Sequence, residues 1–250
     1  MKFSIITATF NSEKYISTNI NSIKNQTYTD YEQIIIDNNS SDKTIQIIKN
    51  FKHDIKIFSE SDNGIYNAFN KGIKKVSGDI ISILNSDDLY SDENVLCEVV
   101  KIFKSKNIDI LYGDLRYVGK NNINSTKRFW KSNNYKFGSF KLGWSPPHPT
   151  LFIKKEIYEK YGLFKEDLGT CADFELMFRF MEQNLLKTFY LNKTLITMRV
   201  GGESNSNLSG IMKQNFKIIK VLEINKNLFL LIRFFTYKFF NRLAQLIFLK

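Results

Sequence analysis

Four short apolar runs alternate with helix-like stretches over the first 90 residues of this 250-residue chain. Short runs rich in isoleucine are typical of strands buried on both faces of a sheet. No hairpin signal joins consecutive runs, which favours βαβ units and a parallel sheet flanked by helices. The predicted strands are Phe3–Thr7, Ile34–Ile36, Ile55–Phe58 and Ile80–Leu84.

Helices are expected between these strands at about 12–25, 45–51 and 65–76, with Ser12 as the cap of the first. Another is expected at about 92–104. The pattern then changes to shorter strands, some antiparallel, which predict a small added mixed sheet. These strands are expected at Ile108–Tyr112, Leu115–Val118, Lys127–Trp130, Thr150–Ile153 and Thr188–Val200, with a turn at Gly113-Asp114 and a helix at Lys154–Tyr161.

Each of the first four strands ends in a polar cluster. Ligands of open parallel sheets bind outside the carboxyl ends of the strands, so these clusters are expected to line one crevice. The clusters are Thr7–Asn11, Asp37–Asp42, Ser59–Gly64 and Asn85–Asp88.

Two adjacent carboxylates, Asp87 and Asp88, follow the fourth strand. Neighbouring carboxylates at the end of a buried strand repel each other and resist desolvation, which a cation would relieve. Oxygen ligands of this kind suit Mg²⁺ or Mn²⁺ carrying a diphosphate. The alternative is a strand-to-helix turn in which Asp or Ser caps the next helix.

Two nucleotide-binding motifs are missing after the first strand: Gly-x-Gly-x-x-Gly and a Walker loop. A nicotinamide Rossmann protein and a P-loop NTPase are therefore disfavoured. Asp37 could still accept hydrogen bonds from a base N–H or a ribose hydroxyl; the alternative is a capped loop.

Asp173 and Glu175 precede an apolar-periodic run and are expected in the first turn of a helix, where the helix dipole favours a carboxylate. Asp173 could act as a general base or be a plain N-terminal charge. Farther on, the loop beginning Gly201-Gly202 could approach a phosphate or serve as a hinge.

The formal net charge is +11, and residues 211–250 supply seven of those units through eight cations and one anion. Within them, Leu228–Phe248 is rich in Leu, Ile and Phe but is interrupted by three cations, which suits a basic helix in a membrane interface better than a spanning helix. The alternative is a helix packed on the core or a partner chain. Because the excess charge lies in an apolar tail, no nucleic-acid partner is expected. The start of the chain resembles no export signal and its two cysteines fit no zinc pattern, which favours a cytosolic location.

Six stretches occur in the order and spacing of the family 2 glycosyltransferases with the GT-A fold, and the chain resembles the colanic-acid type of bacterial polysaccharide glycosyltransferase over about residues 1–204. The stretches are Ser4–Asn11, Ile35–Asp42, Ser59–Gly72, Leu84–Asp88, His148–Phe152 and Ala172–Leu176.

The resemblance implies a GT-A domain over 1–205, with a nucleotide-sugar half (1–105) and an acceptor half (106–205), followed by a basic amphipathic helical tail (206–250). It implies Asp173 as catalytic base and Asp87 and Asp88 as ligands of Mn²⁺ or Mg²⁺. The nucleotide-sugar contacts it implies are Thr7, Thr9, Asn11, Asp37, Asp62, Gly64, Asn70, Lys71, Asn85, Ser86 and Asp87.

The implied activity is an inverting, metal-dependent transfer from a nucleotide sugar, by default a UDP-sugar, to a lipid-linked or saccharide acceptor of a growing surface polysaccharide such as lipopolysaccharide or capsule. The tail would hold the enzyme peripherally on the inner face of the cell membrane. The rival functions are a sugar nucleotidyltransferase and a sugar-binding protein without activity.

Overall fold

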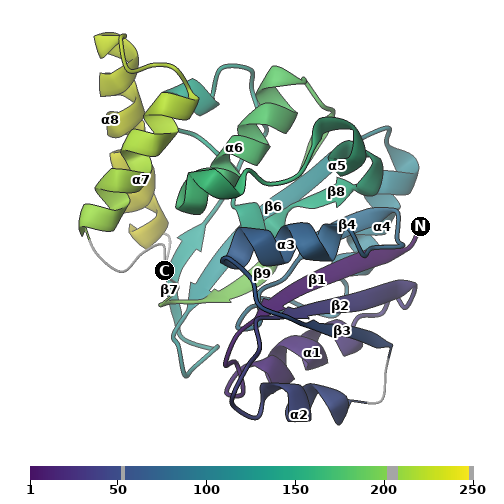
Figure 1. Cartoon of the computed structure of the whole chain (residues 1–250). Coiled ribbons are helices and arrows are strands. Elements are labelled where there is room, and N and C mark those ends of the chain that lie inside the picture. Colours follow the sequence, from purple (N-terminus) through teal and green to yellow (C-terminus); the bar gives the residue numbers. More distant parts are fainter. Residues whose placement is uncertain (52–53, 202–207, 248–250) are drawn as a thin grey trace.

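A computed structural model describes residues 1–51, 54–201 and 208–247. One mixed sheet runs through the molecule in the order β3-β2-β1-β4-β8-β6-β9-β5, with β7 paired to β6 (Figure 1). The first four strands are parallel to one another, as the alternation of apolar runs predicts. They are β1 (Phe3–Thr9), β2 (Tyr31–Asp37), β3 (Ile55–Ser59) and β4 (Ile80–Ile83).

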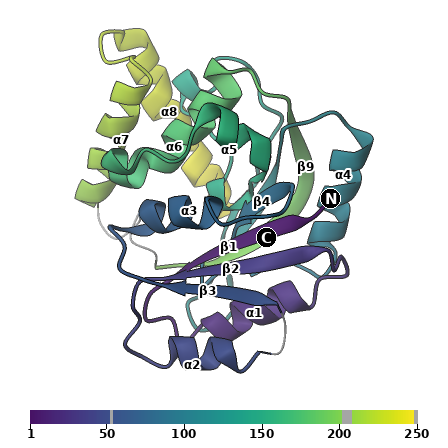
Figure 2. The same ribbon diagram turned by 45° about the vertical axis from the view of Figure 1, so that its right-hand side comes forward.

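Helices cover both faces of this parallel half (Figures 1 and 2). Side chains of α1 (Ile16–Lys24), α2 (Thr44–Lys49) and α4 (Val95–Ser105) pack with one face, in clusters that include Ile5 and Ile35. Helix α3 (Ile65–Ile73) packs on the other face with Ile6, Ile34 and Ile36. Two apolar layers therefore fix the carboxyl ends of the strands at one edge.

The first helix begins later than expected, and Ser12 is not its cap. Helix α1 starts at Ile16 after Tyr15, although the Ser12 carbonyl accepts hydrogen bonds from the N–H groups of both residues. The Ser12 side chain lies 2.8 Å from the Ser86 hydroxyl instead. The loop before α1 therefore connects the ends of β1 and β4 through this contact.

The second half of the chain extends the same sheet with strands of mixed direction, as predicted. Strand β8 is antiparallel to β4 and β6, β7 is antiparallel to β6, and β9 is parallel to β6. These strands are β5 (Leu89–Tyr90), β6 (Ile110–Val118), β7 (Thr126–Trp130), β8 (Phe152–Lys154) and β9 (Thr188–Arg199).

The turn predicted at Gly113-Asp114 is wrong, because β6 runs through it as one strand with a register shift against β9. A Cβ on Gly113 would lie 2.6 Å from the Leu195 side chain, so glycine serves here for close packing between strands. Asp114 is buried, and its carboxylate accepts hydrogen bonds from the Ser132 N–H and the Tyr190 hydroxyl. Gly113-Asp114 therefore forms a bulge in β6, and Asp114 ties β6 to Ser132 and to Tyr190 of β9.

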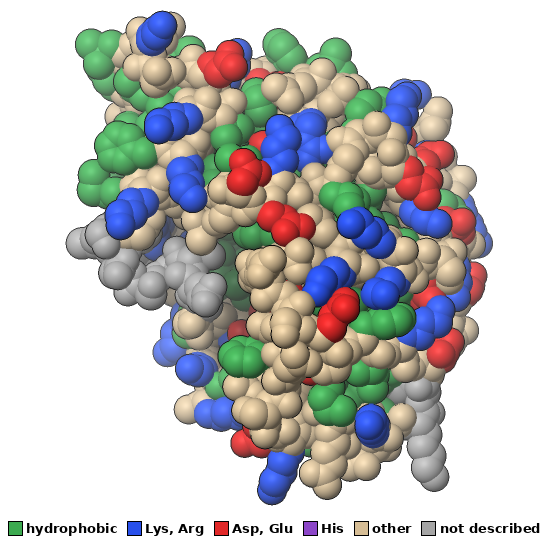
Figure 3. All heavy atoms as spheres, in the orientation of Figure 1, with side chains coloured by type: hydrophobic (Ala, Val, Ile, Leu, Met, Phe, Trp, Pro, Cys, Tyr) green, Lys and Arg blue, Asp and Glu red, His purple; other side chains and the backbone are tan. Residues whose placement is uncertain are grey.

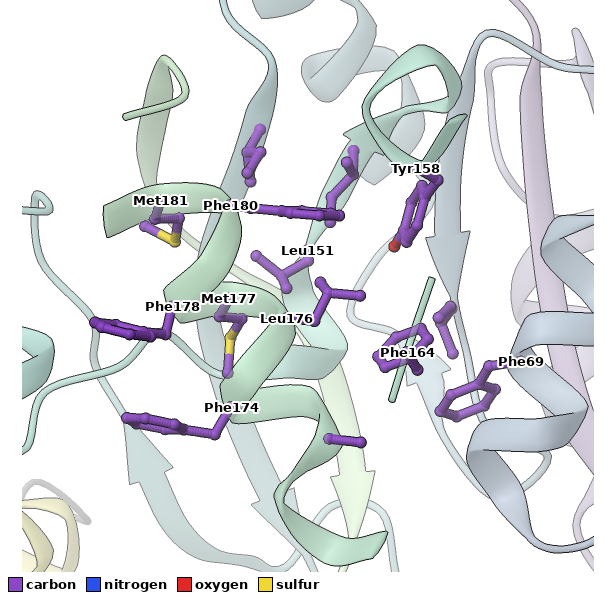
Figure 4. Close-up of a cluster of buried hydrophobic side chains, with 14 of the residues drawn as sticks. Phe69, Leu151, Tyr158, Phe164, Phe174, Leu176, Met177, Phe178, Phe180 and Met181 are labelled. Carbon is purple, nitrogen blue, oxygen red and sulfur yellow. The ribbon is translucent and has the colours of Figure 1, made fainter. Parts of the chain in front are cut away.

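Helix α6 (Ala172–Phe178) is anchored by an apolar cluster on the α3 face of the sheet. Figure 4 shows Leu176 of α6 on the side of Phe164 and of Phe69 of α3, whereas Phe174 and Phe178 point to the opposite side of the helix, where both pack against Phe140. Helix α5 (Lys155–Tyr161), near its predicted position, adds Tyr158. Burial of these rings holds the first turn of α6, and so Asp173, in a fixed place.

Two tail helices, α7 (Leu208–Val221) and α8 (Leu228–Ile247), lie side by side at one end of the molecule (Figures 1 and 2). Ile218, Leu222 and Phe234 join the main core cluster, so one face of the tail packs on the body. Gly143, at φ +94°, lets α8 approach closely, because a Cβ there would lie 2.8 Å from the Phe234 carbonyl oxygen. Over the described ranges, no helix combines the length and hydropathy needed to cross a bilayer. The division at 205/206 stays a prediction.

Candidate active site

The polar ends of the four parallel strands meet, as the sheet rule predicts. Thr9 lies opposite Asp37 in the β1–β2 register, and the Asn38 N–H donates to the Thr9 carbonyl. The Asn38 side chain accepts from the Asp62 N–H at 2.9 Å, which joins the third strand end. The contact of Ser86 with the β1–α1 loop joins the fourth.

The carboxylate pair sits in a tight turn organised by α1. The Asn19 side-chain amide donates to the carbonyls of Asn85 and Asp88, at 2.8 and 3.0 Å. The Asn85 amide donates in turn to Asp88 Oδ2 at 3.2 Å. Asn85 therefore orients the Asp88 carboxylate. These hydrogen bonds hold the turn without using Asn85 Oδ1 or Asp88 Oδ1.

The surroundings of Asp87 and Asp88 disfavour the ionised form of both carboxylates. Burial raises the pKa of Asp88 well above its usual range, and the negative charge of Asp87 raises it further. Burial also raises the pKa of Asp87, which the positive charges of Arg199 and Lys120 oppose. Asp88 is fully buried, so a negative charge there is costly without a partner.

Several polar atoms around this turn have no hydrogen-bond partner within the described part of the chain. They are Asp88 Oδ1, Asn85 Oδ1, Thr9 Oγ1, and Nε and Nη1 of Arg199. Buried polar groups are normally paired, so unpartnered acceptors beside unpartnered guanidinium donors suit a ligand that carries both a cation and anionic oxygens. Among the described residues, no group of three or more His, Cys, Asp or Glu side chains is placed to hold a metal ion by itself. The oxygen donors of Asn85, Asp87 and Asp88 fit a hard cation whose other ligands come from a bound molecule.

Asp37 is fully buried at the end of β2, and its carboxylate is already engaged. Oδ2 accepts hydrogen bonds from the Ser40 N–H at 3.0 Å and the Ser59 hydroxyl at 2.7 Å, and Oδ1 accepts from the Ser40 hydroxyl. Because the side chain is fully buried, a nucleotide base would reach it only after a local movement, such as rotation of a serine hydroxyl.

Three other predicted contact residues sit on β1 and in the loop after it. Thr7 is buried and accepts a hydrogen bond from Gln33 at 3.2 Å. Thr9 has its hydroxyl free of protein partners in the described part of the chain. Asn11 is exposed at φ +47°, and its side-chain oxygen accepts from the Ser41 N–H, so it ties two loops together.

The predicted contacts around α3 divide into two groups. Asp62 accepts a hydrogen bond from the Gly64 N–H at 2.9 Å, which shapes the entry to the helix at the crevice. Lys71 donates to the Ser61 carbonyl. Asn70 points the other way: its amide is fully engaged with both backbone groups of Phe164 and with Glu166. Asn70 therefore anchors the loop before α6.

Asp173 lies half-buried in the first turn of α6, at the predicted position. Its Oδ1 accepts a hydrogen bond from the Phe174 N–H at 2.7 Å, and burial and the Asp173 charge raise the pKa of Tyr66 of α3. Burial lowers the pKa of His148, so this neighbour is neutral at pH 7, while the Asp173 charge opposes that shift. Glu175 is not a second candidate base, because Arg179 and Lys165 pair with its buried carboxylate.

Comparisons with known proteins identify the family. The sequence profile described as "Glycosyl transferase family 2" matches residues 4–162. The chain belongs to the family 2 glycosyltransferases. An uncharacterised glycosyltransferase of Methanocaldococcus jannaschii is 30% identical over 221 residues, covering 84% of this chain and 74% of that protein. A "PGL/p-HBAD biosynthesis glycosyltransferase" of Mycobacterium tuberculosis is 25% identical over 218 residues, covering 82% and 79%.

Solved structures support the GT-A fold of this glycosyltransferase. S. aureus TarS in complex with UDP-GlcNAc has a TM-score of 0.67 at 20% identity, over 88% of this chain and 67% of that one. The mannosyltransferase PcManGT of Pyrobaculum calidifontis, in complex with GDP-Man and Mn²⁺, has a TM-score of 0.60 at 19% identity, over 81% and 58%.

Sequence reasoning missed one residue of the candidate site, Arg199. It ends β9, is buried, donates to the Thr18 hydroxyl at 3.0 Å and lies over the Tyr15 ring. Its charge lowers the pKa of Asp87 and Asp88. A lone arginine closing an apolar strand was the available signal. The neighbouring Gly201-Gly202 loop was singled out instead, and from Gly202 onward that loop lies outside the described residues.

Proposed function

We propose that this glycosyltransferase moves a sugar from a nucleotide sugar, by default a UDP-sugar, to an acceptor hydroxyl with inversion at the anomeric carbon. The observation that carries the proposal is that oxygens of Asp88 and Asn85 in the turn after β4, and nitrogens of Arg199 at the end of β9, have no hydrogen-bond partner within the described part of the chain. A divalent cation would bind the oxygens of Asp88 and Asn85, and the anionic oxygens of a diphosphate would accept hydrogen bonds from the Arg199 nitrogens. The nucleotide-sugar complexes of TarS and PcManGT support this choice.

The donor's diphosphate would lie between the carboxylate pair and Arg199. Asp87 and Asp88, with Asn85, would hold Mn²⁺ or Mg²⁺, which neutralises charge on a leaving diphosphate. Nε and Nη1 of Arg199, which have no hydrogen-bond partner among the described residues, would bind phosphate oxygens directly. Thr9 and Asp62 border the nucleotide and sugar along the strand ends, and Asp37 would meet the base after rotation of Ser40 or Ser59.

Asp173 would take the proton from the acceptor hydroxyl as that oxygen attacks the anomeric carbon from the face opposite the leaving group. It is half-buried rather than sealed, so an acceptor can reach it. The Phe174 N–H donates to Asp173 Oδ1 at 2.7 Å and helps to fix its orientation. Such a displacement needs no covalent enzyme intermediate.

The acceptor would be a lipid-linked chain of a surface polysaccharide, met at the inner membrane surface. Helix α8 supports this, because its outward face is a continuous apolar stripe. Hydrophobic side chains gather on the tail helices among lysines and arginines (Figure 3). The exposed stripe comprises Leu228, Phe229, Ile232, Phe235, Phe239, Phe240 and Leu243, with Arg233 beside it. An apolar face flanked by cations matches a bilayer with anionic headgroups.

A panel of nucleotide sugars, incubated with the whole protein with and without Mn²⁺ or Mg²⁺, tests the reaction. The expected result is metal-dependent release of nucleoside diphosphate from one donor, abolished by Asp87→Ala. The proposal fails if no donor yields product and neither UDP nor GDP with Mn²⁺ raises the melting temperature.

Sedimentation with phosphatidylglycerol vesicles tests the tail. Replacing both Phe239 and Phe240, which are 60% and 66% exposed, by serine should release the protein from the vesicles. The matched control is Phe137→Ser, at a 75% exposed phenylalanine outside the tail. Equal binding by the tail variant and wild type would contradict the docking proposal.

A further inference from the structure

The short 3₁₀ helix η3 (Glu166–Cys171) runs directly into α6, and so into Asp173. Its last residue, Cys171, is buried, but Glu166 and Thr170 near its two ends are exposed. Burial alone therefore does not fix the path of η3. Its position depends on hydrogen bonds from the elements on either side of it.

Helix α3 holds the start of η3. The side-chain amides of Asn67 and Asn70 donate to the Glu166 carboxylate, at 2.9 and 2.7 Å. Asn70 also donates to the Phe164 carbonyl and accepts from the Phe164 N–H, at 2.9 and 3.0 Å. One end of η3 is thus fixed to the helix that begins at the third strand end of the crevice.

Helix α7 of the tail holds the other end. It lies beside α6 in both views of the fold (Figures 1 and 2). The Gln214 side-chain amide donates to the Thr170 carbonyl at 2.8 Å, and the Lys217 ammonium donates to the Leu168 carbonyl at 3.0 Å. The bond from Lys217 is charge-assisted, which makes it stronger than a bond between neutral groups.

Gly169 lies between the two carbonyls that α7 binds. Its backbone has φ +55° and ψ −132°, outside the helical region, and kinks η3. Glycine adopts such a conformation at little steric cost. A Cβ on Gly169 would lie 3.4 Å from Lys217 Nζ, so the ammonium sits directly against the kink. Helix α7 therefore grips η3 where its backbone departs from the helix.

Helix α7 has anchors that do not involve Gln214 or Lys217. Ile218 and Ile219 are buried in the main core cluster. Asn215 accepts a hydrogen bond from Lys238 of α8 at 2.9 Å. Because these contacts hold α7 on the body, its two polar side chains can be replaced without releasing the helix.

We propose that Gln214 and Lys217 are positioning residues for Asp173, which act through η3. A general base has to lie within about 3 Å of the group whose proton it takes. A displacement of about 1 Å, caused far from the chemistry, can lower a rate by about 10²-fold. Bonds from α3 and α7 at the two ends of η3 would keep the first turn of α6 from shifting. The inference rests on the proposed function, because it concerns the base of that same reaction.

Release of nucleoside diphosphate by the whole protein, without vesicles and with the donor and metal identified by the panel above, tests the proposal. In the double variant Gln214→Ala/Lys217→Met, kcat should fall by about 10–10²-fold, while KM for the donor stays unchanged. Lys217→Arg keeps a cationic donor and should retain most of the rate. Lys213→Met, at an exposed lysine of the same helix, is the matched control and should keep the wild-type kcat.

Hydrogen exchange measures the position of η3 directly. Amides of the peptide 166–174 should exchange faster in the double variant than in wild type, because local opening becomes easier when the bonds to α7 are lost. Peptides of α1 should exchange equally in both proteins. The melting temperature should stay near that of wild type, since Ile218 and Ile219 remain buried.

An unchanged kcat in the double variant would overturn the inference, as would unchanged exchange of the peptide 166–174. A raised KM at unchanged kcat would also overturn it, since the two side chains would then act on donor binding. Asp173→Asn in the same assay separates the two proposals. If Asp173→Asn loses turnover and the double variant keeps it, only the positioning role is wrong. If Asp173→Asn turns over at the wild-type rate, the proposed base is wrong and the inference falls with it.

Discussion

Replacing Asp88 by asparagine should stabilise the ligand-free protein and, at the same time, remove its stabilisation by nucleoside diphosphate and Mn²⁺. Asp88 is fully buried, and its pKa is raised by burial and by the charge of Asp87. Asparagine keeps the shape and removes the charge. The variant should thus be more stable than wild type without ligand, but less stabilised by the ligand. A purely structural role for Asp88 would not produce this combination.

The expected gain in the free energy of unfolding of Asp88→Asn can be estimated from the repulsion between the Asp87 and Asp88 carboxylates. Two unit charges ~4 Å apart repel by about 4 kcal/mol at an effective dielectric constant of 20. Arg199 and the hydrogen bond from Asn85 offset part of this cost. A net gain of about 1–2 kcal/mol is expected, in the range found when a site shaped for function is relieved. For a chain of this size that corresponds to a rise in Tm of about 2–8 °C.

Thermal unfolding of the whole protein measures both effects. Wild type with UDP and Mn²⁺ at about 100 times the dissociation constant should gain about 2.7 kcal/mol, and the variant should gain almost none. Asp30→Asn is the charge-matched control, because Asp30 is 56% exposed and forms a loose ion pair with the terminal amine at 3.8 Å. A lower Tm of Asp88→Asn without ligand would refute the reasoning, since the carboxylate would then stabilise the turn more than its burial costs.

Three further predictions concern single side chains. Asp173→Asn should keep UDP binding but lower turnover by about 10²–10⁴-fold, and a rate within a few-fold of wild type in a product-release assay would rule out its role as base. Glu32 is buried, and its carboxylate accepts hydrogen bonds from Lys56, Ser4 and Ser77. Burial alone would raise its pKa, but these hydrogen bonds lower the pKa to about 2. The ionised carboxylate therefore stabilises the fold above pH 4.5. Glu32→Gln should therefore cost about 2–3 kcal/mol at pH 7 in urea unfolding, with the gap closing as the pH falls from 4.5 to about 2. Burial lowers the pKa of Lys238 from 10.5 to about 8, so the unfolded chain binds more protons between these values and stability should rise with pH there, a rise that Lys238→Met abolishes in melts from pH 7 to 11.

The parallel half of the fold could be predicted because its information is local. Each buried strand is a short apolar run, and the rule for parallel sheets then places Thr9, Asp37 and Asp87 at one edge. Asp173 at the start of α6 could be predicted for the same reason, because an acidic residue before an apolar-periodic run marks a helix start. These positions depend on neighbours a few residues away.

The missed features depend on partners far along the chain. Gly113-Asp114 has the composition of a turn, and only the packing of Leu195 and the bonds of Asp114 to Ser132 and Tyr190 make it a bulge. Arg199 reaches the carboxylate pair because β5, the short strand that follows Asp88, pairs antiparallel with β9 with Leu89 opposite Thr197. No local pattern encodes that pairing.

Helix α8 combines the two properties that the proposed acceptor requires. Its outer face carries exposed aromatic and aliphatic side chains, and its inner face brings Lys238 near Phe174 of α6 and Gln245 against Arg128 of β7. An α-helix with its side chains is about 10–12 Å across, so a helix lying in the interface would keep its inner face about that far from the buried apolar stripe. The proposed lipid-linked acceptor would have the matching order of parts, with an apolar chain for the bilayer followed by the sugar that would have to reach Asp173. The same helix would thus set the depth of the enzyme in the membrane and the distance from the lipid to the proposed base, so a change in the apolar face should alter acceptor use without altering donor binding.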